Sequence, residues 1–353
     1  MQEVARAAGV STATVSLALR GKPQIPEATR LRVCTAAREL GYSPNPLVSA
    51  LMATRRRARK TFQASLGFLT GHATPGGWRE FTPAYGDLFR GIRKRATDLG
   101  YSVEEFWGRE PGIDPARLRS ILWTRGVQGI LVAPQPIEDA KLPDLDWSDF
   151  SVLALGYSVR EPEFHRISHD YFHGMALALT QCRAKGYRRI GLNLDRRVST
   201  VTFNLWFAAY LAEQRTHVDA QPIEPLITEG PNAAALRSWL IRERPDCLVC
   251  LEPWRLEQDG LIPRGLPTAS LNVDESPRPV PGVSRDFEVI GAAAVDRIVS
   301  LVQLNDRGIP TRPQTVLLQG LWVHDDLLIA SRSLEPSGSP SKSIIAARKR
   351  KGA

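Results

Sequence analysis

Three histidines stand at a spacing that can bind a metal ion. His165, His169 and His173 recur every four residues, so on one helix they would share a face. The stretch at residues 166–170 is instead typical of a strand that enters a loop, so these side chains are not expected to converge. The chain also contains no GxSxG, HExxH or P-loop motif. We therefore predict that the chain is not an enzyme and uses no metal ion or other cofactor.

A CxxC pair occurs at Cys247 and Cys250. It lies in the apolar run at residues 246–251, which predicts a buried strand, and residues three apart on a strand point to opposite faces. The other cysteines, Cys34 and Cys182, are scattered. This usage predicts plain core cysteines in a reducing, cytoplasmic protein.

The charge of the chain is concentrated at its two ends. The net charge is +9, and residues 1–60 hold 11 Lys/Arg against three Glu. Residues 333–353 hold five Lys/Arg against one Glu, so the body between the ends is slightly acidic. Such asymmetry indicates a polyanion partner for the ends. The longest apolar stretches fall well short of the roughly 18 residues of a membrane span, and the N-terminus has no apolar core typical of a secretory signal, so we expect no membrane association.

The basic N-terminal segment predicts three helices. Residues 2–8 form the first, which Gly9 ends, and Ser11 caps a second at residues 12–19. A third follows at residues 27–40, with Leu31, Cys34, Ala37 and Leu40 expected on its inner face. Two short helices joined by a Gly-Val-Ser turn and followed by a third are typical of a helix-turn-helix.

The second helix suits a major groove. Thr12, Ala13 and Ser16 are small and face outward on this helix, which allows close approach to base edges. Ser11 and the free amides at the start of the helix can bind phosphate. A three-helix bundle with another purpose is the alternative, and the surrounding positive charge argues against it.

Three stretches then carry a family resemblance: VARAAGVSTATVS at residues 4–16, TRLRV at residues 29–33 and ELGYSPN at residues 39–45. Together they resemble the LacI/GalR family of bacterial transcription regulators. The resemblance implies a helix-turn-helix domain at residues 1–44, a hinge helix at residues 45–53 and a basic linker at residues 54–63.

The resemblance also implies a homodimer on double-stranded DNA with a pseudo-palindromic operator. Paired hinge helices would enter the minor groove, with Leu51 as an apolar wedge beside Ala50, Asn45 capping the helix and Arg55 on the backbone. The implied DNA contacts are Ser11, Thr12, Ala13, Thr14, Ser16, Leu17, Arg20, Asn45, Ala50, Leu51 and Arg55.

The match has three departures. Leu17 stands where the family has an arginine, so it offers only an apolar contact, and Arg20 stands where an asparagine is usual. Met1 falls in the first turn of the first helix, so we expect either an upstream start or a frayed helix.

From residue 64 onward, predicted strands and helices alternate, which favours doubly wound parallel sheets. The family body resembles periplasmic binding proteins, with two subdomains and a ligand in the cleft. It would span residues 64–332. The N-subdomain is expected at about 64–157 plus 287–319, and the C-subdomain at about 158–286 plus 320–332.

Ligands of such sheets bind beyond the carboxyl ends of the strands. By position in the family, Phe203 replaces an arginine that clamps sugar hydroxyls, and Glu252 falls in place of part of an Asn-Asp pair. Tryptophans at 78, 107, 206 and 254 favour an aromatic-lined pocket for a carbohydrate, or else belong to the core or a dimer interface. The expected effector contacts are Ala84, Tyr85, Leu88, Trp107, Asp170, Phe203, Glu252, Trp254, Asn272 and Asp274.

These features predict a homodimeric, effector-responsive repressor of a carbohydrate-utilisation operon. The alternative is a sugar-binding protein with the same body and no DNA partner. Residues 333–353 are expected to be a disordered basic tail, and they lack the leucine heptads of a tetramerising coiled coil. The effector, the operator and the sign of regulation stay open.

Overall fold

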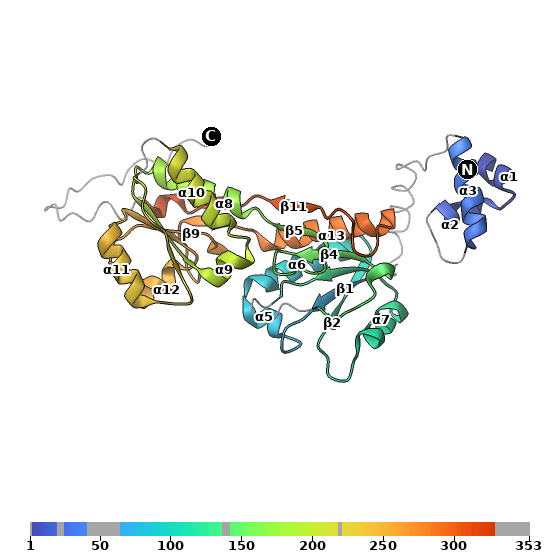
Figure 1. Ribbon diagram of the computed structural model, residues 1–353, viewed down its shortest axis with the longest axis horizontal. Helices are drawn as coiled ribbons and strands as arrows, with labels where there is room; N and C mark the ends of the chain where they lie inside the picture. The colour runs from blue at the N-terminus through green and yellow to red at the C-terminus, as the bar shows by residue number, and fades with distance from the viewer. Residues whose placement is uncertain (1, 20–24, 41–63, 136–141, 218–220, 329–353) are drawn as a thin grey trace, which may run out of the picture.

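The computed structural model of the chain describes residues 2–19, 25–40, 64–135, 142–217 and 221–328 (Figure 1). Within these ranges the chain forms three N-terminal helices, followed by two six-stranded sheets that are each covered by helices. The predicted class, a helix-turn-helix segment before a doubly wound α/β body, is confirmed.

The N-terminal helices are α1 (Gln2–Ala8), α2 (Thr12–Leu19) and α3 (Glu27–Glu39). Their shared interior consists of valines and alanines, among them Val4, Val15 and Val33. Small side chains let three short helices pack closely around one another.

The inner face expected for α3 is partly wrong. Leu31 and Leu40 are 59% and 48% exposed, whereas Val33, Ala36 and Ala37 are buried. The helix turns Val33, Ala36 and Ala37 inward, where they pack against the alanines and valines of α1 and α2.

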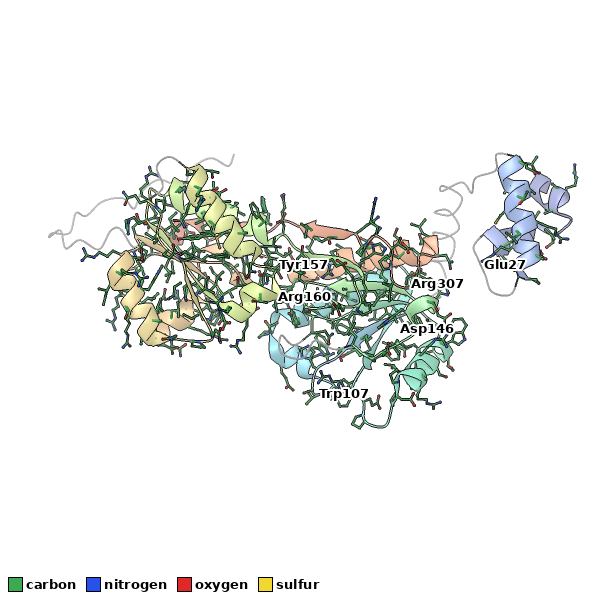
Figure 2. All side chains as sticks on the ribbon, in the orientation of Figure 1. Glu27, Trp107, Asp146, Tyr157, Arg160 and Arg307 are labelled. Carbon is green, nitrogen blue, oxygen red and sulfur yellow. The ribbon has the colours of Figure 1, made fainter. Side chains whose placement is uncertain are left out.

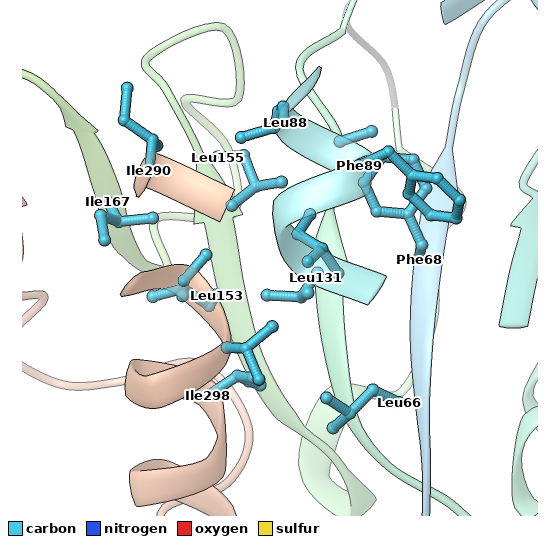
Figure 3. Close-up of a cluster of buried hydrophobic side chains, with 14 of the residues drawn as sticks. Leu66, Phe68, Leu88, Phe89, Leu131, Leu153, Leu155, Ile167, Ile290 and Ile298 are labelled. Atoms are coloured by element: carbon cyan, nitrogen blue, oxygen red, sulfur yellow. The ribbon is translucent and has the colours of Figure 1, made fainter. Parts of the chain in front are cut away.

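The first sheet is entirely parallel and runs in the order β11-β5-β4-β3-β1-β2. Alternate side chains point to opposite faces, so α6 (Ala84–Asp98) and α13 (Phe287–Leu304) cover one face and α7 (Pro115–Thr124) covers the other. Figure 3 shows the first of these cores, where Leu66, Phe68 and Leu131 meet the helices. The strands are β1 (Ala64–Thr70), β2 (Tyr101–Trp107), β3 (Val127–Val132), β4 (Ser151–Leu155), β5 (His165–His169) and β11 (Thr315–Leu318).

The second sheet runs in the order β12-β10-β9-β8-β6-β7, and only β12 is antiparallel to its neighbour. Helices α8 (Tyr171–Ala184) and α10 (Leu205–Thr216) cover one face, and α11 (Ala233–Glu243) and α12 (Pro253–Gln258) lie on the other side. The strands are β6 (Ile190–Asp195), β7 (Leu226–Thr228), β8 (Cys247–Cys250), β9 (Thr268–Ser270), β10 (Gly282–Ser284) and β12 (Leu321–Val323).

The CxxC cysteines point to opposite faces of β8, as predicted. Cys247 is buried in the core under α8, where its Sγ lies 3.6 Å from that of Cys182, and Cys250 is buried in the core under α11. Burial raises the pKa of Cys250, and the hydrogen bond with the Cys182 thiol, together with burial, raises the pKa of Cys247. Both therefore stay protonated core thiols.

Three connections carry the chain between the two sheets: from β5 to α8, from β10 to α13, and from β11 to β12. The subdomain boundary predicted at residues 157/158 is wrong, because β5 pairs in parallel with both β4 and β11 and so belongs to the first sheet. The boundary lies instead at the end of β5, where His169 is followed by Asp170. Pairing with neighbouring strands decides which sheet a strand joins, and spacing along the chain does not reveal it.

Candidate functional site

The turn between α1 and α2 exposes the start of α2. Gly9 has φ +63°, a left-handed conformation that glycine adopts without steric cost, and it lets the chain reverse after α1. The Oγ of Ser11 then accepts a hydrogen bond of 3.1 Å from the backbone N–H of Thr14. The predicted N-cap is therefore present, and both Ser11 and Thr12 are exposed at the positive end of the helix.

The remaining expected DNA contacts divide into two groups. Thr14 and Leu17 are half-buried on α2, and Ala13 and Ser16 belong to the same helix. Outside the described residues lie the whole hinge helix, the basic linker and the tail, together with Arg20, Asn45, Ala50, Leu51 and Arg55.

A cavity of about 70 Å³ lies between the two subdomains. The first subdomain supplies its floor from α6, β4, β5 and α13, and the second supplies α8, α9 (Arg196–Val201) and the segment before α13. The residues that line it are Tyr85, Leu88, Pro134, Leu155, Gly156, Tyr157, Ser158, Ile167, Ser168, His169, Tyr171, Val201, Arg285, Phe287 and Ile290.

Two polar side chains in this cavity are buried with incomplete hydrogen bonding. Within the described residues, the Oγ of Ser168 makes no hydrogen bond, and the ring nitrogens of His169 make none of full geometry, although the backbone of Leu318 interacts with this ring. The two residues are 2% and 3% exposed. Burial, assisted by the charge of Arg285, lowers the pKa of His169 to about 3. Its ring is therefore neutral near pH 7, with one nitrogen that donates and one that accepts. Unmade hydrogen bonds of this kind are costly, so they point to a ligand as the missing partner.

The imidazole of His169 occupies space that two glycines leave open. A Cβ at Gly174 would lie 2.8 Å from Nε2, and one at Gly320 would lie 2.9 Å from Cε1. Gly320 belongs to the connection from β11 to β12, and Gly174 lies in the first turn of α8. The ring thus sits where two of the crossing connections meet.

Arg285 is the cation of the cavity wall. Its Nε donates to the Oδ1 of Asn272 at 3.0 Å, its Nη2 lies 3.5 Å from the Oε1 of Glu275, and its guanidinium stacks on Phe287 at 4.6 Å. Asn272, which the sequence places in the effector contacts, is itself 3% exposed and positions this arginine. Its role in the cavity is therefore indirect.

Asp274 fixes the connection from β10 to α13. Its carboxylate accepts hydrogen bonds from the Oγ of Ser284 at 2.6 Å and from the backbone N–H of Arg285 at 2.7 Å. Asp170 has a similar structural task, because its Oδ1 caps α8 by accepting from the N–H of His173 at 2.9 Å. Asp170 lies between two lining residues and does not line the cavity itself.

Of the expected effector contacts, Tyr85 and Leu88 line the cavity, and Ala84 is buried in the adjoining core. Glu252 stands at the start of α12, where burial raises its pKa and Arg255 lies 3.2 Å away. Phe203 is 48% exposed outside the lining.

The aromatic wall of the cavity is not made of tryptophan. Trp78, Trp206 and Trp254 are buried, and the Nε1 of Trp107 donates to the carbonyl of His72 at 2.8 Å. The aromatic lining comes instead from Tyr85, Tyr157, Tyr171 and Phe287.

Sequence reasoning missed Ser158, Ser168, His169 and Arg285 as well. All of them lie at or beside the ends of β4, β5 and β10, so a correct assignment of these strands to their sheets was the signal that could have found them.

Two other features of the described residues bear on function. No cluster of three or more His, Cys, Asp or Glu in these ranges is arranged to hold a metal ion, since His165 and His169 lie on β5 and His173 on α8. No described helix combines the length and apolarity needed to cross a membrane.

Comparison with known proteins agrees with the N-terminal geometry. Residues 1–45 match the family model described as bacterial regulatory proteins, lacI family. The maltose regulon regulatory protein MalI of Escherichia coli (strain K12) is 33% identical over 38% of this chain and 35% of its own length. The HTH-type transcriptional regulator GntR of the same strain is 27% identical over 56% of each chain. The matched regions span between a third and just over half of these relatives.

Solved structures show the same fold over more of the chain. A complex of the transcriptional regulator CelR with cellobiose has a TM-score of 0.50 at 19% identity, covering 91% of this chain and 97% of that one. A ribose operon repressor protein from Lactobacillus acidophilus has a TM-score of 0.51 at 13% identity, covering 75% and 98%. These two structures show that the chain shares their fold, and the match to the lacI family model covers residues 1–45.

Proposed function

We propose that this protein is a sequence-specific, effector-responsive DNA-binding regulator. In this proposal it is not an enzyme, and it acts as a homodimeric repressor of a carbohydrate-utilisation operon. The observation that carries the proposal is the exposed, Ser11-capped start of α2 within a segment that matches the lacI family model. A carbohydrate as effector class is supported by the names of relatives, which include a maltose regulon regulator and a cellobiose complex.

On DNA, α2 enters the major groove with its N-terminus first. The Ser11 hydroxyl and the free amides of the first turn bind a phosphate, and Thr12 and Leu17 reach base edges. The hinge helix at residues 45–53, with Leu51 as a wedge, then opens the minor groove at the centre of a pseudo-palindromic operator. The linker arginines add affinity that does not depend on sequence.

The cavity between the subdomains is the proposed effector site. A ligand there touches both subdomains beside the segments that connect them. Its binding therefore favours one arrangement of the subdomains over another. Ser168 and His169 offer hydrogen bonds to hydroxyl groups, and the tyrosines offer faces for the C–H side of a sugar. The change in arrangement alters the spacing of the paired hinges and hence the DNA affinity.

Selection of binding sites from a random duplex pool by the full-length protein tests the DNA-binding proposal. We expect a recovered pseudo-palindrome with a flexible central step. Thr12→Asp should abolish the selection, because a carboxylate at the first turn favours the helix yet repels phosphate. Thr124→Asp is the matched control, since Thr124 is exposed at the end of α7 and is expected to leave the selection intact.

The opposite result would favour the alternative function. A chain that recovers no consensus, and whose weak DNA binding is the same in Thr12→Asp, would be a small-molecule binding protein with the same body and no specific operator.

A further inference from the structure

The connection between β4 and β5 reaches across to the second subdomain. An Nη2–H of Arg160 donates to the carbonyl of Thr200 at 2.6 Å, and its guanidinium lies 4.6 Å from the ring centre of Phe203. The ring of Tyr157 meets Phe203 edge-on at 5.3 Å. Figure 2 shows Tyr157 and Arg160 where the two subdomains meet. These contacts join a loop of the first subdomain to the last turn of α9 and the turn that follows it in the second.

The connection between β4 and β5 is fixed by a buried arginine on β5. Arg166 on β5 is 4% exposed, and its Nη1 donates to the carbonyls of Gly156 and Val159, both at 3.2 Å. Its guanidinium also lies 5.3 Å from the ring centre of Tyr157. Within the described residues neither Arg160 nor Arg166 has a carboxylate within ion-pair distance, so their hydrogen bonds and ring contacts serve the loop.

The turn between α9 and α10 holds the ring of Phe203 in place through a strained backbone conformation. Phe203 and Asn204 have φ of +53° and +56°, left-handed values that side-chain-bearing residues rarely adopt. The turn is locked by the N–H of Asn204, which donates to the carbonyl of Ser199 at 2.7 Å, and by the Oγ of Ser199, which donates to the Oδ1 of Asn204 at 2.9 Å. This strained turn directs an exposed ring towards the opposite loop.

We propose that Tyr157, Arg160 and Phe203 form an aromatic–cation clamp that holds the two subdomains closed over the cavity. Tyr157 lines the cavity from one side, and Val201 lines it from the end of α9, where Arg160 binds Thr200, so the clamp positions walls from both sides. That the cavity is the effector site rests on the proposed function. The clamp itself rests only on the contacts across the cleft.

The small size of the cavity links the clamp to ligand entry. At about 70 Å³ the cavity is smaller than the cavity of about 150 Å³ that admits benzene in an engineered protein. A space of this size does not enclose a whole sugar, so full enclosure requires the subdomains to move apart, and that movement breaks the clamp contacts. The clamp thereby sets how often the empty protein opens, whichever ligand it accepts.

Hydrogen exchange of the full-length protein, without DNA or ligand, tests the clamp. In Arg160→Met and in Phe203→Leu, the amides of residues 199–204 should exchange about threefold to tenfold faster, which is the range expected for losing one partly exposed cation–aromatic contact with its hydrogen bond. The double variant should exchange faster by less than the product of the two single effects, because the Arg160–Phe203 contact is lost in both single variants. Arg160→Lys keeps the charge and should recover part of the protection.

A second arginine that stacks on a ring provides the matched control. Arg125 lies 5.7 Å from the ring centre of Phe106 and pairs with Glu104 at 2.9 Å, entirely within the first subdomain. Arg125→Met should leave the exchange of residues 199–204 unchanged.

Two results would overturn the clamp: unchanged exchange at residues 199–204 in Arg160→Met, or effects of the single variants that multiply in the double variant. Site selection on DNA by the unmodified chain is scored separately. Intact selection with no exchange effect removes only the clamp, and lost selection with a clear exchange effect removes only the DNA-binding function.

Discussion

Ser168 and His169 are neighbours at the end of β5, and both keep buried polar atoms that lack a well-formed hydrogen bond in the described chain. A folded protein gains stability when such atoms are satisfied or removed, so their retention indicates a use in binding. In the proposed function, the same residues that weaken the empty protein would bind the effector.

Ser168→Ala should therefore stabilise the protein without ligand. We expect its free energy of unfolding to rise by about 1 kcal/mol, because the substitution removes an unsatisfied buried hydroxyl. Ser151→Ala is the control and should lower it by about 1 kcal/mol, since the Oγ of Ser151 donates to the carbonyl of Asp306 at 2.7 Å. Urea unfolding monitored by circular dichroism measures both values. Equal losses in the two variants would mean that the Ser168 hydroxyl already has a partner.

His169 should make stability depend on pH in a defined direction. Its pKa is about 3 in the folded chain and about 6.5 when unfolded, so the unfolded state takes up the proton first as pH falls. Its contribution is constant above about pH 7 and is lost progressively from about pH 6.5 down to about pH 3. Between pH 7.5 and 5.5 the loss is about 1.4 kcal/mol. The gap in unfolding free energy between wild type and His169→Gln should change by this amount, and a gap independent of pH would contradict the assignment.

At the scale of elements, the crossing of α6 and α13 depends on two glycines. A Cβ at Gly91 would lie 2.0 Å from the carbonyl oxygen of Glu288, and one at Gly291 would lie 2.1 Å from that of Leu88. The backbones therefore touch, and the pair of helices covers the core that Figure 3 shows. This contact binds the late helix α13 to the early part of the first subdomain.

Gly91→Ala should accordingly destabilise the protein by about 3 kcal/mol or more, because the added methyl group forces two packed helices apart. Gly86→Ala lies in the same helix, where an added Cβ meets nothing within 4 Å. It should stabilise the protein by about 0.5 to 1 kcal/mol through helix propensity. Thermal unfolding of the two variants decides the matter, and similar melting temperatures would refute the close crossing.

Elements were more predictable than their partners. The bounds of α1 and α2 match the expected ranges because helical periodicity and end signals are local. Strand β5 was expected at its place but in the wrong subdomain, because its pairing with β11 joins residues far apart in the chain. The sequence does not predict the lining of the cavity for the same reason. Ser168 and His169 meet Arg285 and Phe287 only after the crossing connections form.

At the scale of the whole molecule, charge is divided between a basic N-terminal segment and a mildly acidic body. In the proposed function, the basic segment would neutralise DNA phosphates and the mildly acidic body would bind the effector, so the two tasks would fall to different parts of the chain.

Binding to a random-sequence duplex should fall steeply with salt. A dimer that contacts about 6 to 10 phosphates loses roughly 10³-fold or more in affinity between 50 and 200 mM salt. Fluorescence polarisation with a labelled duplex measures the slope. Replacing Arg55, Arg56 and Arg57 by alanine should flatten it, whereas an unchanged slope would place the phosphate contacts elsewhere.

The three crossing connections also determine the order in which the two subdomains can fold during synthesis on the ribosome. The first sheet needs β11, and its core needs α13, yet residues 170–286 are synthesised before either. At about 5 to 20 residues per second, the first subdomain waits on the order of 10 s with the outer edge of β5 unpaired. The second subdomain lies later in the chain, yet five of its six strands have been synthesised once residue 286 is added. A nascent chain of this protein is therefore most exposed to misassembly in the half that begins to emerge first.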